Sequence, residues 1–83
     1  MELQDIYEEI EARIARARSR YGFFASTHEA LGVAMEEWDE LKDSIRENAL
    51  YSVEHEALDL AAVLINLVYS LRHSTNMRER SIK

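Results

Sequence analysis

Residues 56–71 of the chain read EALDLAAVLINLVYSL, and nearly every position from Leu58 to Leu71 is apolar. A helix formed by this stretch is apolar on almost every side, which is typical of a central helix that its neighbours cover all round. Asp59 and Asn66 interrupt the pattern seven residues apart, on one face of the helix. Because a buried aspartate is almost always paired, Asp59 requires a partner. The stretch therefore predicts the centre of an all-α fold with a charged site inside it.

An amphipathic helix is predicted at the start of the chain, over residues 3–21. Ile6, Ile10 and Ile14 recur every four residues and form one apolar stripe on an otherwise charged segment. Gly22 then provides the residue type that most often ends a helix. The charges of this segment are typical of the solvated outer face of a bundle helix.

A second helix is predicted from Thr27 to about Asn48. Residues 26–29 read STHE and fit a capping box, in which the serine and the glutamate side chains accept hydrogen bonds from free backbone N–H groups. Its apolar positions are spaced by three and four residues and line one face: Leu31, Ala34, Trp38, Leu41 and Ile45. Ser52 is the expected cap of the third helix. We expect an antiparallel bundle of three long helices and a short C-terminal segment, completed by dimerisation.

Length and composition narrow the class of protein. The chain has 83 residues, which suits one domain over residues 1–83 with a core small enough to favour a partner subunit. A net charge of -6 argues against binding to nucleic acid or to an anionic membrane. The absence of cysteine excludes disulfides and thiolate metal sites. The apolar run is too short to span a bilayer and the first residues lack a secretory signal, so we expect a cytoplasmic protein.

Two acidic motifs lie on the second and third predicted helices. The first contains Glu36, Glu37 and Glu40, and the second contains Glu56 and Asp59. Each motif places two carboxylates three residues apart, on one side of a helix. Taken alone, the first motif is typical of a solvated face, and Glu56 is explained by the favourable field at a helix start. Asp59, within the apolar run, has no such explanation.

The neighbouring sequence does not neutralise these acids. The only arginine or lysine residues between positions 26 and 71 are Lys42 and Arg46. Two like charges 4 Å apart repel by about 4 kcal/mol at an effective dielectric of 20, so four clustered carboxylates oppose folding unless a cation lies among them. Oxygen ligands suit Mg²⁺, or Mn²⁺ in its place, and no His-x-x-x-His spacing supports zinc. The motifs therefore predict a magnesium site, and Mg²⁺ commonly binds substrate phosphates.

Together the two motifs resemble the signature of the MazG-like nucleotide pyrophosphohydrolases, of the all-α NTP pyrophosphatase superfamily. A Glu-Glu-x-x-Glu pattern is followed after fifteen residues by Glu-x-x-Asp. The residues of the pattern are Glu36, Glu37, Glu40, Glu56 and Asp59. The segments STHEALGV at 26–33 and DLAA at 59–62 are also similar to small MazG-like proteins.

The resemblance implies a helical dimer, or a dimer of dimers, that binds Mg²⁺ and hydrolyses a nucleoside triphosphate to the monophosphate and pyrophosphate. Carried over by position, it implies four metal ligands: Glu37, Glu40, Glu56 and Asp59. Glu36 would then be an acid outside the ligand shell. Glu37 or Glu40 would orient the water that attacks phosphorus, which makes them the candidate catalytic residues.

Substrate contacts are less specific in the sequence. His28 and Asn66 are candidates, although His28 also fits a surface position near a helix cap and Asn66 a satisfied core amide. Trp38 could stack on a base, but its place in the apolar stripe favours packing in the core or at a dimer interface.

Phosphate-binding cations are expected near the C-terminus, because the core offers few. The candidates are Arg72, His73, Arg78 and Arg80. The alternative function is a non-catalytic acidic helical module, related to this family, that dimerises and binds a partner.

Overall fold

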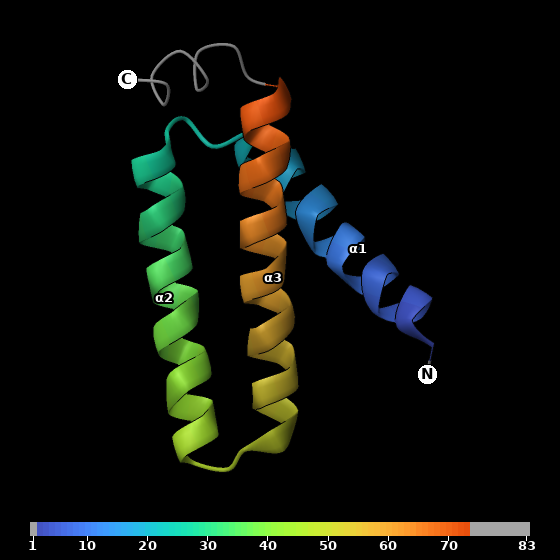
Figure 1. Cartoon of the computed structure of the whole chain (residues 1–83), viewed down its shortest axis with the longest axis vertical. Helices are drawn as coiled ribbons and strands as arrows, with labels where there is room; N and C mark the ends of the chain where they lie inside the picture. The colour runs from blue at the N-terminus through green and yellow to red at the C-terminus, as the bar shows by residue number, and fades with distance from the viewer. Residues whose placement is uncertain (1, 74–83) are drawn as a thin grey trace.

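The computed structural model describes residues 2–73, and these form an all-α structure (Figure 1). Helix α1 spans Leu3–Tyr21, α2 spans Thr27–Arg46 and α3 spans Leu50–His73. α2 and α3 run side by side and antiparallel, whereas α1 packs obliquely on α3 with its N-terminal end directed away from α2 (Figure 1). The predicted all-α class with three long helices is confirmed. The expected C-terminal segment, with Arg78 and Arg80, lies outside the described residues.

Helix α1 begins and ends where predicted, and Gly22 explains why it ends at Tyr21. Gly22 follows the helix with φ 73° and ψ −157°, a conformation that only glycine adopts readily. Its N–H donates to the carbonyl of Arg18 at 2.9 Å and closes the turn. The chain then leaves the helix axis and returns through residues 23–26 to start α2.

The predicted residues cap the start of α2, but one of the two hydrogen bonds has a different donor from the one expected. The hydroxyl Oγ of Ser26 accepts from the N–H of Glu29 at 3.1 Å, as expected. The carboxylate of Glu29, however, accepts from the N–H of Ala25 at 3.2 Å rather than from Ser26. Both side chains therefore satisfy free backbone donors, and α2 begins at Thr27 as predicted.

The predicted start of α3 at Ser52 is wrong. α2 ends at Arg46, and α3 already begins at Leu50. Asn48 lies between them with φ 56°, in the left-handed region that asparagine tolerates better than most residues. This one residue reverses the chain direction, so the connection is short and Ser52 lies in the first turn of α3.

The core lies between α1 and α3. Ile10, Ile14 and Ala62 are buried together, and the predicted isoleucine stripe of α1 faces α3. Other apolar side chains pack against this cluster: Ile6, Leu58, Ala61 and Tyr69. The stripe is thereby confirmed as the face of α1 that packs on α3.

Apolar side chains also remain at the surface of both long helices. We call them the apolar stripes: Leu31, Met35, Trp38 and Ile45 on α2, and Leu64, Ile65 and Val68 on α3. The prediction that α3 is covered all round is wrong for the single chain, because Leu64 and Ile65 are each 48% exposed. The cause is that α1 packs on only one side of α3. Among the described residues, no helix combines the length and apolarity needed to cross a membrane.

Candidate metal centre

The antiparallel pairing of α2 and α3 brings the acidic motifs together. Carboxylate oxygens of Glu37, Glu40 and Glu56 lie within 4.8 Å of one another. Ligand atoms of His55, Glu56 and Asp59 form a second group with the same spacing. Glu56 belongs to both groups, so the four residues predicted as metal ligands form one continuous cluster. Glu36 is exposed and belongs to neither group.

Glu37 is the most perturbed acid of the cluster. Its Oε2 atom is buried and has no hydrogen-bond partner among residues 2–73. Burial, followed by the negative charges of Glu40, Asp59 and the other acids, raises the pKa of Glu37 to about 7. A carboxyl group in this state is about half protonated at neutral pH, and a bound cation would favour its charged form.

Glu56 shares this condition. Its Oε2 atom is also buried and, within the described part of the chain, unpartnered. Burial raises the pKa of Glu56, close approach to the Glu40 side chain and the negative charges of Glu40 and Asp59 raise this pKa further, and His55 lowers it. Orphaned oxygens of this kind are rare in folded proteins and call for an explanation. An all-oxygen group with two such atoms fits a hard divalent cation.

Asp59 has a partner that the sequence analysis did not anticipate. The Nε atom of Arg13, on α1, donates to Asp59 Oδ1 at 2.8 Å, and both side chains are mostly buried. His55 Nε2 lies 3.5 Å from Asp59 Oδ2, and His55 Nδ1 lies 3.1 Å from Arg13 Nη2. The prediction that Asp59 needs a partner is confirmed. The search for cations between positions 26 and 71 did not include α1, which packs against α3 at the level of Asp59 and supplies Arg13.

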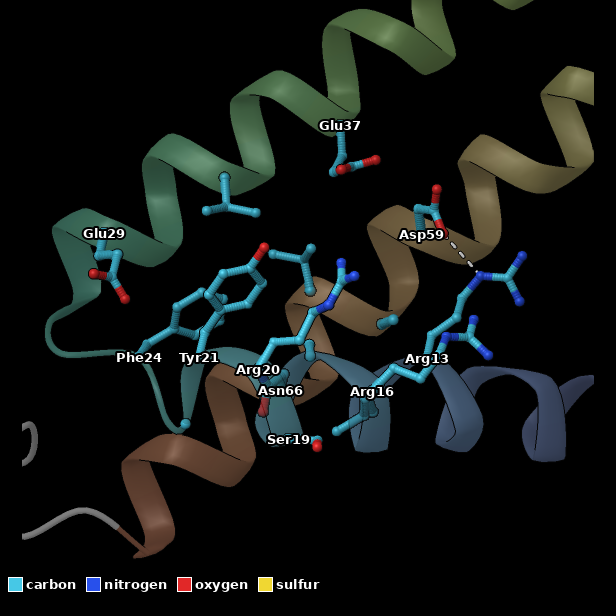
Figure 2. Close-up of a pocket in the computed structure, with 16 residues that line it drawn as sticks. Arg13, Arg16, Ser19, Arg20, Tyr21, Phe24, Glu29, Glu37, Asp59 and Asn66 are labelled. Carbon is cyan, nitrogen blue, oxygen red and sulfur yellow. Dashed lines mark hydrogen bonds and ion pairs between the residues drawn. The ribbon is translucent and has the colours of Figure 1, made fainter.

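A pocket of about 1040 Å³ adjoins the cluster (Figure 2). Glu37 and Asp59 line it on one side, whereas Glu40 and Glu56 do not. Asn66 also lines it, with 4% of its surface exposed and its Oδ1 atom lacking a partner among the described residues. Asp59 and Asn66 thus share a face, as predicted.

His28, the other predicted substrate contact, is not among the residues that line this pocket. It is exposed in the first turn of α2. Glu29, its neighbour, lines the pocket instead. Glu29, which already has a capping role, therefore lines the pocket, and His28 does not.

Three arginines of α1 also belong to the site, although their sequence did not lead us to predict them there. Arg13, Arg16 and Arg20 all line the pocket and rise from α1 toward the side that carries Glu37 and Asp59 (Figure 2). Their spacing of three and four residues places them on one face of the helix, a signal that was present in the sequence. These arginines were predicted to face solvent, because the sequence of α1 alone does not show which of its polar faces packs against another helix.

Comparisons of the chain with protein-family models, with curated proteins and with solved structures found no match. The assignment of a function therefore depends on the motif residues and on the geometry of the site.

Proposed function

We propose that this protein is a Mg²⁺-dependent nucleoside triphosphate pyrophosphohydrolase, which releases pyrophosphate and a nucleoside monophosphate. Such an activity would serve to remove damaged nucleotides or to control dNTP pools. The observation that carries the proposal is the pair of buried, unpartnered carboxylate oxygens on Glu37 and Glu56, two residues that, with Glu40, each place a carboxylate oxygen within 4.8 Å of the others. A pocket of about 1040 Å³ beside them has the size of small-molecule sites.

The residues of the cluster have distinct roles in this proposal. Glu37, Glu40, Glu56 and Asp59 would hold the ion. When bound, Mg²⁺ neutralises charge on phosphate oxygens and lowers the pKa of water. Glu37 or Glu40 would orient the attacking water and accept its proton, and the charged form of Glu37, which a bound cation favours, is the form that can accept it. The unpartnered Oδ1 of Asn66 accepts a hydrogen bond from a substrate N–H or O–H group.

Pyrophosphate release from a panel of standard and modified (d)NTPs at high Mg²⁺ tests the proposal. We expect release by the wild type and its loss in Glu40→Gln and Asp59→Asn. Glu11→Gln is the control, because Glu11 is exposed on α1, belongs to neither acidic group and does not line the pocket. Absence of release from every nucleotide of the panel would contradict the proposal.

The alternative of a non-catalytic helical module is favoured by one specific observation. Arg13 already neutralises Asp59 at 2.8 Å, so this acid is satisfied in the protein alone. Thermal unfolding with and without Mg²⁺ or Mn²⁺ separates the two functions. A ligand at 100 times its dissociation constant stabilises the native state by about 2.7 kcal/mol, so the hydrolase predicts a clear rise in Tm and the module predicts none.

A second copy of the chain is the partner that we propose for the apolar stripes. The core of one chain is small, and both long helices present large apolar side chains to solvent. Burying them in a homodimer, or in a dimer of dimers, would add the apolar contacts that a domain of this size lacks.

A further inference from the structure

We propose that Arg16 and Arg20 bind the phosphate groups of a nucleotide in the pocket beside the acidic cluster. The inference deepens the proposed function, since it concerns the ligand of the same site. Both arginines line the pocket from α1, opposite the helices that carry Glu37 and Asp59 (Figure 2). Phosphates held there would lie between a row of cations and the oxygens that would bind a metal.

The charge of these two arginines is available. Arg13 pairs with Asp59, whereas neither Arg16 nor Arg20 forms an ion pair with any residue from 2 to 73. Both side chains are exposed, so an anion can reach them without displacing another protein group. The planar guanidinium donates two parallel hydrogen bonds to phosphate oxygens, which makes arginine well suited to phosphate recognition.

The distribution of charge along the chain supports this assignment. The chain has ten Lys and Arg residues and a net charge of -6. Four of these ten cations fall within the eight residues from Arg13 to Arg20. Arg18 lies over the ring of Tyr69, with its guanidinium carbon 4.4 Å from the centroid, and does not line the pocket. Arg13, Arg16 and Arg20 lie on the face of α1 that lines the pocket.

Asn66 indicates that the ligand is more than a phosphate ion. Its buried Oδ1 is a hydrogen-bond acceptor without a donor among the described residues. Sugar hydroxyls and base N–H groups provide such donors. Tyr21 and Phe24 line the pocket beyond Arg20, away from Asp59, and offer aromatic surface for a base (Figure 2). Cations, an acceptor and aromatic rings along one pocket match the parts of a nucleotide.

Arg72 and His73, the expected phosphate ligands, lie in the last turn of α3 and do not line this pocket. The position of α1 explains the difference. Its polar face covers the pocket and supplies cations where the sequence of α2 and α3 has few.

Titration calorimetry on the metal-free, full-length protein at low ionic strength tests the inference. The probes are inorganic tripolyphosphate and a non-hydrolysable nucleoside triphosphate. We expect Arg16→Gln and Arg20→Gln each to weaken binding of both probes about tenfold, and the double variant about a hundredfold. Arg46→Gln is the control, because Arg46 is exposed at the end of α2 and outside the pocket; it should change affinity less than about twofold. The wild type should bind the nucleotide about tenfold more tightly than tripolyphosphate.

Several outcomes would overturn the inference. These are equal dissociation constants for the wild type and the double variant, an equal loss in Arg46→Gln, and equal affinity of the wild type for the two probes. Because both arginines are exposed, we expect each variant to unfold at the same temperature as the wild type, and circular dichroism melts check that loss of binding is not caused by misfolding. Binding through Arg16 and Arg20 without pyrophosphate release would support this site and reject the hydrolase. Release with an unchanged KM in the double variant would support the hydrolase and reject this site.

Discussion

Glu37 combines a buried carboxylate oxygen with four acidic neighbours whose charges act on it. In the unfolded chain its pKa has the ordinary value of 4.5, and in the folded, metal-free protein it is about 7. Between these pH values Glu37 is protonated in the folded state and ionised in the unfolded state. Its contribution to the free energy of unfolding is therefore fully present below pH 4.5, and it is lost as the pH rises through about 7.

We predict that the free energy of unfolding of the metal-free protein decreases as the pH is raised through this interval. Urea denaturation at about pH 5 and about pH 8 measures the decrease, and Glu37→Gln should reduce it by about 1–2 kcal/mol, after allowance for the partial exposure of the side chain. Glu11→Gln, at an exposed position on α1 that is not among the acids raising the pKa of Glu37, is the control and should behave as the wild type. Parallel pH profiles for the wild type and Glu37→Gln would show that the proton is not bound there.

The two glycines of the chain illustrate how local conformation sets the helices. Gly22 ends α1 with φ 73°, whereas Gly32 lies inside α2, and a Cβ atom at either position would meet no atom within 4 Å. Space is therefore equal at the two positions, and only backbone conformation distinguishes them. A side chain at Gly22 is strained, and a side chain at Gly32 restricts the unfolded chain and favours the helix.

We predict opposite effects for the same substitution at these positions. Gly22→Ala should destabilise the protein by about 1–2 kcal/mol, and Gly32→Ala should stabilise it by about 0.5–1 kcal/mol. Thermal or urea denaturation of the two variants measures both changes. Destabilisation of similar size by both substitutions would mean that close packing, rather than the backbone angle of Gly22, decides the outcome.

Some helix ends and the acidic cluster could be predicted from the sequence, because they depend on a few neighbouring residues or on a short connection between two helices. The bounds of α1 and the start of α2 follow from Gly22 and from Ser26, whose roles depend on a few adjacent residues. The start of α3 was missed because Asn48 turns the chain without a glycine or a proline to mark the turn. Glu37 and Glu56 could be brought together from the sequence, since a short connection makes two helices antiparallel neighbours.

The arginines of the site were not predictable in the same way. Arg13 and Asp59 are separated by 46 residues, and their contact depends on how α1 lies across α3. The isoleucine stripe indicates which face of α1 is buried, but the height at which it meets α3 follows from side-chain packing around Ala62. Periodicity alone carries no information about that height.

At the scale of the molecule, residues 2–73 leave many large apolar side chains exposed. Trp38 is 48% exposed, and Ile65 and Val68 on α3 are exposed to a similar extent. Exposed apolar surface of this kind on a small domain indicates an association site. Since the two stripes follow helices of 20 and 24 residues, another pair of helices could pack along them.

We predict that the protein is a homo-oligomer at micromolar concentration and that Ile65→Glu shifts it toward a monomer of lower stability, because a charge would have to be buried at the interface. Analytical ultracentrifugation over a range of concentrations measures the change. Tyr51→Glu is the control, since Tyr51 is 87% exposed at the first turn of α3 and belongs to neither stripe. A stable, monodisperse wild-type monomer would contradict the prediction.

The contact between Arg13 and Asp59 would couple the docking of α1 to the binding of a cation at the proposed metal site. A divalent ion on Oδ1 of Asp59 would have to displace Arg13, which joins α1 to α3 at 2.8 Å, whereas an ion on Oδ2 would leave the pair closed. In the first case the apparent affinity for the ion would be the intrinsic affinity reduced by the fraction of molecules in which the pair is open. By the same linkage, an ion on Oδ1 would weaken the attachment of α1 and free a third guanidinium for an incoming anion. Arg13 would then compete with the proposed metal for Asp59, and a phosphorylated ligand that binds Arg13 would relieve the competition.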